Sequence, residues 1–319
     1  MHTFSKFRHV NAKTIDEAVS ELGQSNAWVY AGGTDLLGTM RSHIFSKDMY
    51  PEVIINLKSL SPSLDYIKEE GGVLKIGATT RLEDIATSSV VKGKWAALAE
   101  AAHKTASPHI REMGTIGGNI CQLNRCWYFR KVENRFDCIR KGGNMCYAIA
   151  GDNRYHSIFG AVQACVAVNP SDTAPALVAL DATIVTSRRE IAAEDFWAVG
   201  VPGSTVLDAD EIVKEIQVPA FSGKSCFVKF ALRSSIDFPI VNCAAAIDGG
   251  NARICLNAVY NTPYRATAAE ESIAGKAIDT ANAEAAGAAA VTGAQKLSLN
   301  NYKIQVAKGM VKKAILGCA

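Results

Sequence analysis

The stretch from Thr115 to Asp172 constrains the fold of this chain more than any other feature. It opens with the turn TIGGNI (residues 115–120) and closes with NPSDTAP (residues 169–175). Paired glycines let backbone N–H groups approach a ligand at a distance that a Cβ would forbid. We predict that the two turns hold one bound cofactor and that the polar, irregular segment between them wraps a second. This segment contains five of the nine cysteines, Cys121, Cys126, Cys138, Cys146 and Cys165.

Composition is that of an ordinary globular protein with two or three domains. The 319 residues are 48% hydrophobic and 20% charged. A net charge of +3 gives no reason to expect nucleic-acid or membrane binding, and no apolar run approaches the roughly 20 residues that cross a bilayer. The N-terminus does not read as a secretory signal, and the odd number of cysteines favours a reduced cytoplasmic location. Export with a signal-bearing partner, to the periplasm, remains the alternative.

Strands and helices alternate irregularly, which predicts α+β subdomains and not one doubly wound sheet. Residues 14–22 begin with an N-cap threonine and carry apolar residues at helical spacing. Residues 28–31 read as a buried strand that runs directly into Gly32 and Gly33. Further strands are expected at residues 53–57, 74–78 and 183–187, and further helices at residues 81–86, 94–106 and 176–182.

A domain boundary is expected near residues 219–223, where proline and glycine interrupt the pattern. We predict a first domain of two α+β subdomains over residues 1–220 and a second domain over residues 221–319. The second domain is expected to be a three-stranded antiparallel sheet covered by alanine-rich helices. Its strands are predicted at residues 226–230, 241–247 and 252–259, the last two joined by a hairpin turn at residues 248–251.

Two glycine turns are the strongest ligand signals. The first, AGGTD (residues 31–35), follows a strand, and the second is the turn that begins at Thr115. Each alone is more often an ordinary tight turn, but two of them flanking an α+β segment are harder to dismiss. Neither has the lysine and hydroxyl residue of a P-loop or the spacing of a Rossmann fingerprint, which argues against an ordinary ATP or NAD site.

In combination these turns resemble those of the FAD-binding subunit of the molybdenum hydroxylases, the family of xanthine dehydrogenase, carbon monoxide dehydrogenase and aldehyde oxidoreductases. The resemblance also includes KIGA (residues 75–78), SPHIR (residues 107–111) and PSD (residues 170–172), and it covers essentially the whole chain. It implies an oxidoreductase subunit in which glycine-turn amides hold the FAD pyrophosphate and a residue such as Asp172 holds cofactor hydroxyls. The cofactor-binding residues implied are Ala31, Gly32, Gly33, Thr34, Asp35, Leu36, Thr115, Gly117, Gly118, Asn119, Asp172 and Lys229.

Other polar residues receive weaker assignments. Lys229 and Arg233 lie on the part that closes over the flavin in similar subunits, but solvated strand-end charges are at least as good an interpretation. His109 and His156 lack neighbours that form a triad, so structural roles are preferred. The implied mechanism needs no side-chain acid or base, and no catalytic residue is predicted.

The cysteine segment, at about residues 121–165, departs from most of this family. An insertion of about forty residues is uncommon without a purpose. It resembles the insertion in flavoprotein subunits of 4-hydroxybenzoyl-CoA reductase and of the periplasmic aldehyde oxidoreductase type, which ligates a [4Fe–4S] cluster. The resemblance implies Cys126, Cys138, Cys146 and Cys165 as ligands. Cys121 could replace one of them, although a core thiol is the preferred interpretation.

Charge is consistent with a cluster, because the insertion is rich in arginine and lysine, which would offset thiolate charge. Structural zinc also accepts four cysteines, but usually from paired Cys-x₂₋₄-Cys units, which this segment lacks. A zinc-stabilised interaction subunit without flavin is therefore one alternative. A free-standing flavin oxidase is another.

The resemblance implies an electron-transfer subunit of a hetero-oligomer. Its implied partners are a molybdopterin-binding large subunit and a small ferredoxin-like subunit with [2Fe–2S] clusters. Electrons would leave through FAD in an aldehyde oxidoreductase and enter from a donor in a 4-hydroxybenzoyl-CoA reductase. The oxidising direction is slightly preferred.

Overall fold

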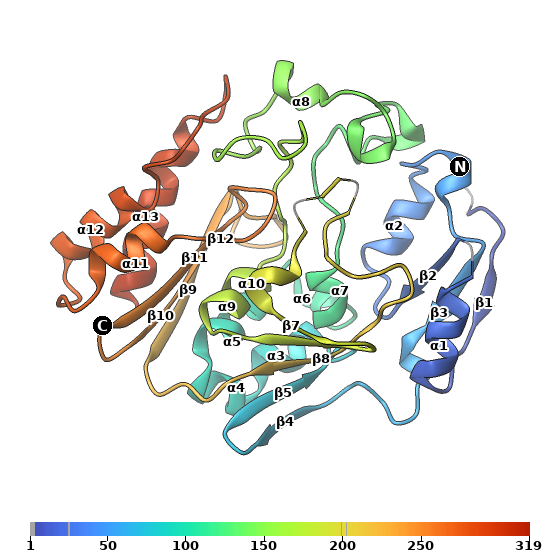
Figure 1. Ribbon diagram of the computed structural model, residues 1–319, viewed down its shortest axis with the longest axis horizontal. Helices are drawn as coiled ribbons and strands as arrows, with labels where there is room; N and C mark the ends of the chain where they lie inside the picture. Colours follow the sequence, from blue (N-terminus) through green and yellow to red (C-terminus); the bar gives the residue numbers. More distant parts are fainter. Residues whose placement is uncertain (1–3, 25, 199, 202) are drawn as a thin grey trace.

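A computed structural model describes residues 4–319 except Ser25, Val199 and Pro202. Its three sheets follow one another across the molecule, with the N-terminal sheet on the right of Figure 1 and the C-terminal sheet on the left. The N-terminal sheet is parallel with strand order β1-β3-β2. Helix α1 (Ile15–Leu22) packs on it and begins where Thr14 Oγ1 accepts a hydrogen bond from Glu17 N. The strands are β1 (Arg8–Val10), β2 (Ala27–Tyr30) and β3 (Val53–Asn56).

The central sheet is antiparallel, with strand order β4-β5-β8-β6-β7. It lies at the bottom of Figure 1, and helices including α3, α5 and α9 cover its upper face. Leu74, Ile76, Ile184 and Ile216 are fully buried between the sheet and these helices. The strands are β4 (Ile67–Glu70), β5 (Val73–Gly77), β6 (Thr183–Thr186), β7 (Glu190–Ala192) and β8 (Val213–Val218).

Most helices of the first domain are short. The helix expected over residues 94–106 is present as α5, which begins only at Ala96, because the chain leaves helical geometry at Trp95, whose ring is fully buried. The helices are α2 (Leu36–Arg41), η1 (Lys47–Met49), η2 (Leu57–Ser59), α3 (Leu82–Thr87), α4 (Ser89–Lys94), α5 (Ala96–His103), α6 (Pro108–Arg111), α7 (Ile116–Ile120), α9 (Thr173–Ala179) and α10 (Ala193–Phe196).

The C-terminal sheet is antiparallel with strand order β12-β11-β10-β9, and helices cover one face of it (Figure 1). The three long strands agree with the prediction, and the short β12 adds a fourth strand at the edge. The elements are β9 (Lys224–Phe230), β10 (Val241–Asp248), β11 (Asn251–Asn257), β12 (Tyr264–Arg265), α11 (Thr267–Ile273), α12 (Thr280–Ala289) and α13 (Tyr302–Leu316).

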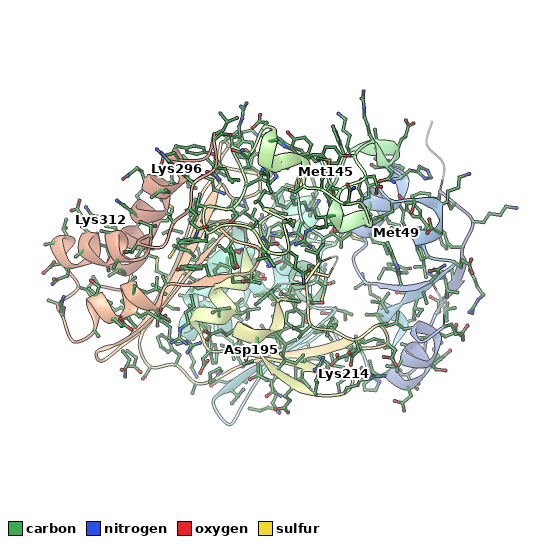
Figure 2. All side chains as sticks on the ribbon, turned by 45° about the horizontal axis from the view of Figure 1, so that its top comes forward. Met49, Met145, Asp195, Lys214, Lys296 and Lys312 are labelled. Atoms are coloured by element: carbon green, nitrogen blue, oxygen red, sulfur yellow. The ribbon has the colours of Figure 1, made fainter. Side chains whose placement is uncertain are left out.

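The cysteine segment, residues 121–165, runs across the top of Figure 1 from the side of α2 towards the C-terminal helices. It contains only the short helices η3 (Val132–Asn134), η4 (Ile139–Lys141) and α8 (Tyr147–Ala150). Figure 2 brings this segment forward and shows Met145 on it, half exposed at 50%. No helix in the described ranges is long and apolar enough to cross a bilayer.

Candidate functional site

A cavity of about 650 Å³ lies where the two subdomains of the first domain meet the C-terminal domain. Its volume is in the range of ordinary cofactor sites. The predicted residues Ala31–Leu36, Thr115, Gly117–Asn119 and Asp172 all line it. The structure therefore brings together two turns that are more than eighty positions apart in the chain. Lys229 is outside the wall, but it contacts Asp172.

The first glycine turn has unused hydrogen-bond donors. Gly33 adopts a positive φ of 70°, and a Cβ on Gly32 would lie 2.0 Å from the carbonyl oxygen of Met113, so both positions require glycine. Within the part of the chain that the structure describes, no acceptor is found for the N–H groups of residues 32–35. Since these residues line the cavity, their N–H groups are available to anionic oxygens of a ligand.

The second glycine turn forms the start of α7, and the N–H groups of Ile116, Gly117 and Gly118 already have acceptors. Ile116 N donates to Thr80 O at 3.0 Å, and Gly117 N donates to Ala78 O at 2.9 Å. Gly118 N donates to the Thr115 hydroxyl at 3.2 Å. The second turn therefore offers a ligand fewer free N–H groups than the first, and the role of its amides in holding a pyrophosphate stays a prediction. Gly117 serves close packing, because a Cβ there would lie 2.8 Å from Ala78 O.

Asp172 forms a buried ion pair with Lys229, with 2.7 Å between Oδ2 and Nζ. Asn242 Nδ2 donates to the other carboxylate oxygen, also at 2.7 Å. Burial raises the pKa of Asp172, and the Lys229 ammonium opposes that shift. Lys229 is thus not a solvated strand-end charge, and both oxygens of Asp172 already accept a protein hydrogen bond. Arg233, in contrast, is exposed and pairs with Asp237, as its solvated interpretation predicts.

Asp35 connects the first glycine turn to the cysteine segment. Its Oδ1 lies 2.8 Å from Arg125 Nη2 and 2.7 Å from Arg130 Nη1, and its Oδ2 accepts from Leu123 N at 3.0 Å. Burial opposes ionisation, but the two guanidinium groups outweigh it and hold the pKa of Asp35 below its usual value. The side chain of Asp35 therefore binds protein groups, and the groups of the first turn that are free to bind a ligand are its backbone N–H groups.

Cys126, Cys138, Cys146 and Cys165 line one small cavity of about 10 Å³ beneath the cysteine segment. Cys121 is not among its lining residues and instead lies in the wall of the large cavity, where burial raises the pKa of its thiol to about 12. Among the described residues, no group of three or more His, Cys, Asp or Glu is arranged to hold a metal ion. The four predicted ligands are thus neighbours around a space that holds about one water.

Backbone N–H groups surround these four sulfurs. A neutral thiol is a weak acceptor, so a concentration of N–H donors suits a thiolate or a metal-bound sulfur better. The donors belong to Tyr128 and Phe129 for Cys126, to Arg140 for Cys138, to Ala148, Ile149 and Val166 for Cys146, and to Ala167 for Cys165.

Side chains add positive charge to the same small cavity. Arg140 is buried and donates from Nε to Cys165 Sγ at 3.0 Å. Lys141 is also buried, and its charge acts against the effect of burial on the pKa of Cys138. His156 Nε2 lies 3.2 Å from Cys126 Sγ, which gives this histidine the structural role that its sequence context favours.

Comparison with known proteins identifies the family. Residues 5–221 match the FAD binding domain in molybdopterin dehydrogenase, and residues 227–318 match the CO dehydrogenase flavoprotein C-terminal domain. The chain belongs to this family of FAD-binding subunits. The predicted resemblance to the molybdenum hydroxylases is confirmed, and the chain is an oxidoreductase subunit.

Individual relatives of this FAD-binding subunit agree with the assignment. The aldehyde oxidoreductase FAD-binding subunit PaoB of Escherichia coli (strain K12) is 32% identical over 81% of this chain and 82% of its own. The carbon monoxide dehydrogenase medium chain of Hydrogenophaga pseudoflava is 30% identical over 97% of this chain and 96% of its own. A solved carbon monoxide dehydrogenase from the same organism, lacking the Mo-pyranopterin moiety, has a TM-score of 0.75 at 28% identity and covers 99% of this chain and 98% of that chain. The narrower resemblance to 4-hydroxybenzoyl-CoA reductase stays a prediction.

The large cavity of this FAD-binding subunit is also lined by residues that sequence reasoning missed. Residues 236–238 from the C-terminal domain line the large cavity, as do Thr205 and residues 207–209 from the first domain. Arg125 lines it too, although its sequence context indicated only a cation beside a cysteine. Ile236 has a φ of 68°, which is unusual for a β-branched residue, but no local sequence signal announces it.

Proposed function

We propose that this chain is the FAD and [4Fe–4S] electron-transfer subunit of a molybdenum hydroxylase complex. The observation that carries the FAD assignment is the cavity of about 650 Å³, in whose wall the N–H groups of residues 32–35 have no protein acceptor. The residues that would hold FAD are the predicted ones that line the cavity, with the first turn supplying donors and Thr115, Gly117, Gly118 and Asn119 forming another part of the wall. Bound FAD supplies a ring that exchanges one or two electrons.

The proposed cluster ligands are Cys126, Cys138, Cys146 and Cys165. Their support is the shared small cavity, the N–H donors around the sulfurs and the two buried cations beside Cys165 and Cys138. Four thiolates around a [4Fe–4S] core carry net negative charge, which such surroundings stabilise. Because a cavity of about 10 Å³ is smaller than a cluster, the segment would fold around the cluster as it assembles.

The proposed partners are a molybdopterin-binding large subunit and a small subunit with [2Fe–2S] clusters. The names of the relatives support an oxidising complex of the aldehyde oxidoreductase type, because PaoB is an FAD-binding subunit of one. Inward electron flow, as in a 4-hydroxybenzoyl-CoA reductase, is the alternative. Electrons would pass between the partner clusters and an external acceptor, with substrate chemistry on the large subunit. A cytoplasmic location is proposed, with export beside a signal-bearing partner as the alternative.

The test is anaerobic purification of the whole complex, followed by measurement of flavin, iron, sulfide and zinc. The wild-type chain is compared with Cys146→Ser, and with Cys121→Ser as the matched control. We expect Cys146→Ser to lose about four irons per chain and to keep the iron of the partner clusters, while Cys121→Ser loses none. Zinc in place of this iron overturns the cluster. Absence of flavin from the wild-type complex overturns the FAD assignment.

A further inference from the structure

Arg125 connects the two candidate cofactor sites. It immediately precedes Cys126, a proposed cluster ligand, yet its side chain lies in the wall of the large cavity. Its Nη2 lies 2.8 Å from Asp35 Oδ1, on the first glycine turn, and donates to Gln122 Oε1 at 3.1 Å. Arg125 is therefore next to the proposed cluster site in the sequence, but its side chain lies in the candidate FAD site.

The ring of Phe238, in the C-terminal domain, packs against the Arg125 guanidinium. The Arg125 Cζ lies 4.4 Å from the centre of the Phe238 ring, which is a cation–π distance. Phe238 lines the large cavity and is 45% exposed. Three segments that are distant in sequence thus meet at Arg125: the first glycine turn, the start of the cysteine segment and a loop of the C-terminal domain.

The guanidinium of Arg125 has donors to spare. An arginine carries five N–H donors, and within the described ranges the bonds of Arg125 go through Nη2, with no acceptor for Nη1. Its side chain is 26% exposed. Nε is closed off from solvent and has no acceptor in the same part of the chain. A ligand in the cavity would therefore meet Nη1.

Charge at this place favours an anion. Arg125 and Arg130 both face the single carboxylate of Asp35, so two positive charges share one negative charge. The N–H groups of residues 32–35, beside this carboxylate, also have no acceptor in the described chain. The surplus of donors and positive charge is complementary to a phosphate or to a carbonyl-rich ring system, both of which FAD contains.

We propose that Arg125 binds FAD directly and that, through this contact, FAD and the cluster bind cooperatively. This inference rests on the proposed function. A cluster on Cys126 orders the neighbouring Arg125, which improves the FAD site. By linkage, bound FAD stabilises the cluster segment by the same factor, which for coupled sites is typically about 5–150-fold.

The experiment measures FAD dissociation constants by flavin fluorescence on the deflavinated whole complex. The four forms are wild type, Arg125→Gln, Cys146→Ser and the double variant. We expect each single substitution to weaken FAD binding about tenfold or more, and the double variant to bind little worse than either single one. Arg135→Gln, which removes an exposed arginine of the same segment, is the matched control and should bind FAD like wild type.

If Arg125→Gln binds FAD as tightly as wild type, Arg125 does not contact FAD. If the losses of FAD affinity in the two single variants add fully in the double variant, FAD and the cluster do not bind cooperatively through Arg125. Arg125→Lys keeps the positive charge but lacks the planar set of guanidinium N–H donors, and we expect it to bind FAD with intermediate affinity. This variant guards against a glutamine variant that folds poorly. Iron analysis of the wild-type complex precedes the titration. Missing iron there overturns the proposed cluster, whereas unchanged FAD affinity in an iron-loaded Arg125→Gln complex overturns only this inference.

Discussion

Two carboxylates in the wall of the large cavity, on Asp35 and Glu211, are each held by arginines from elsewhere in the chain. Glu211 accepts from Thr186 Oγ1 at 2.6 Å, from Arg189 Nη2 at 2.9 Å and from Asp208 N at 3.0 Å. Burial works against its ionisation, but these hydrogen bonds prevail and lower the pKa of Glu211 to about 2. Such groups fix the cavity wall and do no redox chemistry themselves.

Replacing Glu211 with Gln tests this role through pH dependence. Because the pKa falls on folding, from an ordinary 4.5 to about 2, its stabilisation is complete above pH 4.5 and disappears as the pH falls towards 2. We expect Glu211→Gln to lower the unfolding free energy by about 1–3 kcal/mol at pH 7. The difference between the melting temperatures of wild type and Glu211→Gln should become smaller as the pH falls from 7 to 3. A constant difference across this range would contradict the assignment.

At the scale of elements, the first glycine turn is a contact between two loops as well as a ligand site. It joins β2 to α2, and Gly32 touches the backbone at Met113 with no room for a side chain. Gly38, inside α2, has open space at its Cβ position. These two glycines, six positions apart, therefore differ in what an added methyl group would do.

Gly32→Ala should destabilise the protein by about 1–3 kcal/mol, because the backbone at Met113 must move. It should also reduce the FAD content of the purified complex, since the shift displaces the free N–H groups. Gly38→Ala is the control, with unchanged FAD content and stability equal to wild type or up to about 1 kcal/mol higher. Melting temperature and flavin absorbance measure both effects. Full FAD retention in Gly32→Ala would refute the importance of the close approach.

At the scale of the molecule, the C-terminal domain makes polar contacts with the later part of the cysteine segment and with Asp172, which lies beyond its end. Asp172, which follows the end of the segment at residue 165, is held by Lys229 on β9 and Asn242 on β10. Lys303 on α13 is fully buried and donates to backbone carbonyls at residues 155, 156 and 258. The two domains thus act as one support for the large cavity.

Asp172→Asn should lower the unfolding free energy by about 3–5 kcal/mol, because it leaves the Lys229 ammonium buried without its carboxylate. The double variant Asp172→Asn/Lys229→Met should recover part of this loss, since both charges are then absent. Thermal melts of FAD-free protein separate this effect from cofactor binding. If the double variant is as unstable as the sum of the single ones, the ion pair is not the cause.

Local sequence alone determined much of this protein. Short-range pattern predicted the buried strands at residues 53–57 and 241–247 and a glycine turn at residues 31–35, and the described structure agrees with them. The choice of Cys126, Cys138, Cys146 and Cys165 over Cys121 came from family resemblance and stays a prediction. These features depend on neighbours in the chain, or on a chemistry that only a few residue types provide.

Only the tertiary structure decided which polar groups are free. The amides of Ile116 and Gly117 in the second turn are occupied because Thr80 and Ala78, some forty positions away, supply the acceptors. Lys229 is buried because Asp172 comes from the other domain, and Arg125 reaches the large cavity because Asp35 and Phe238 meet it there. A hydrogen bond is used or free according to partners that folding brings from a distance, so no local pattern can announce it.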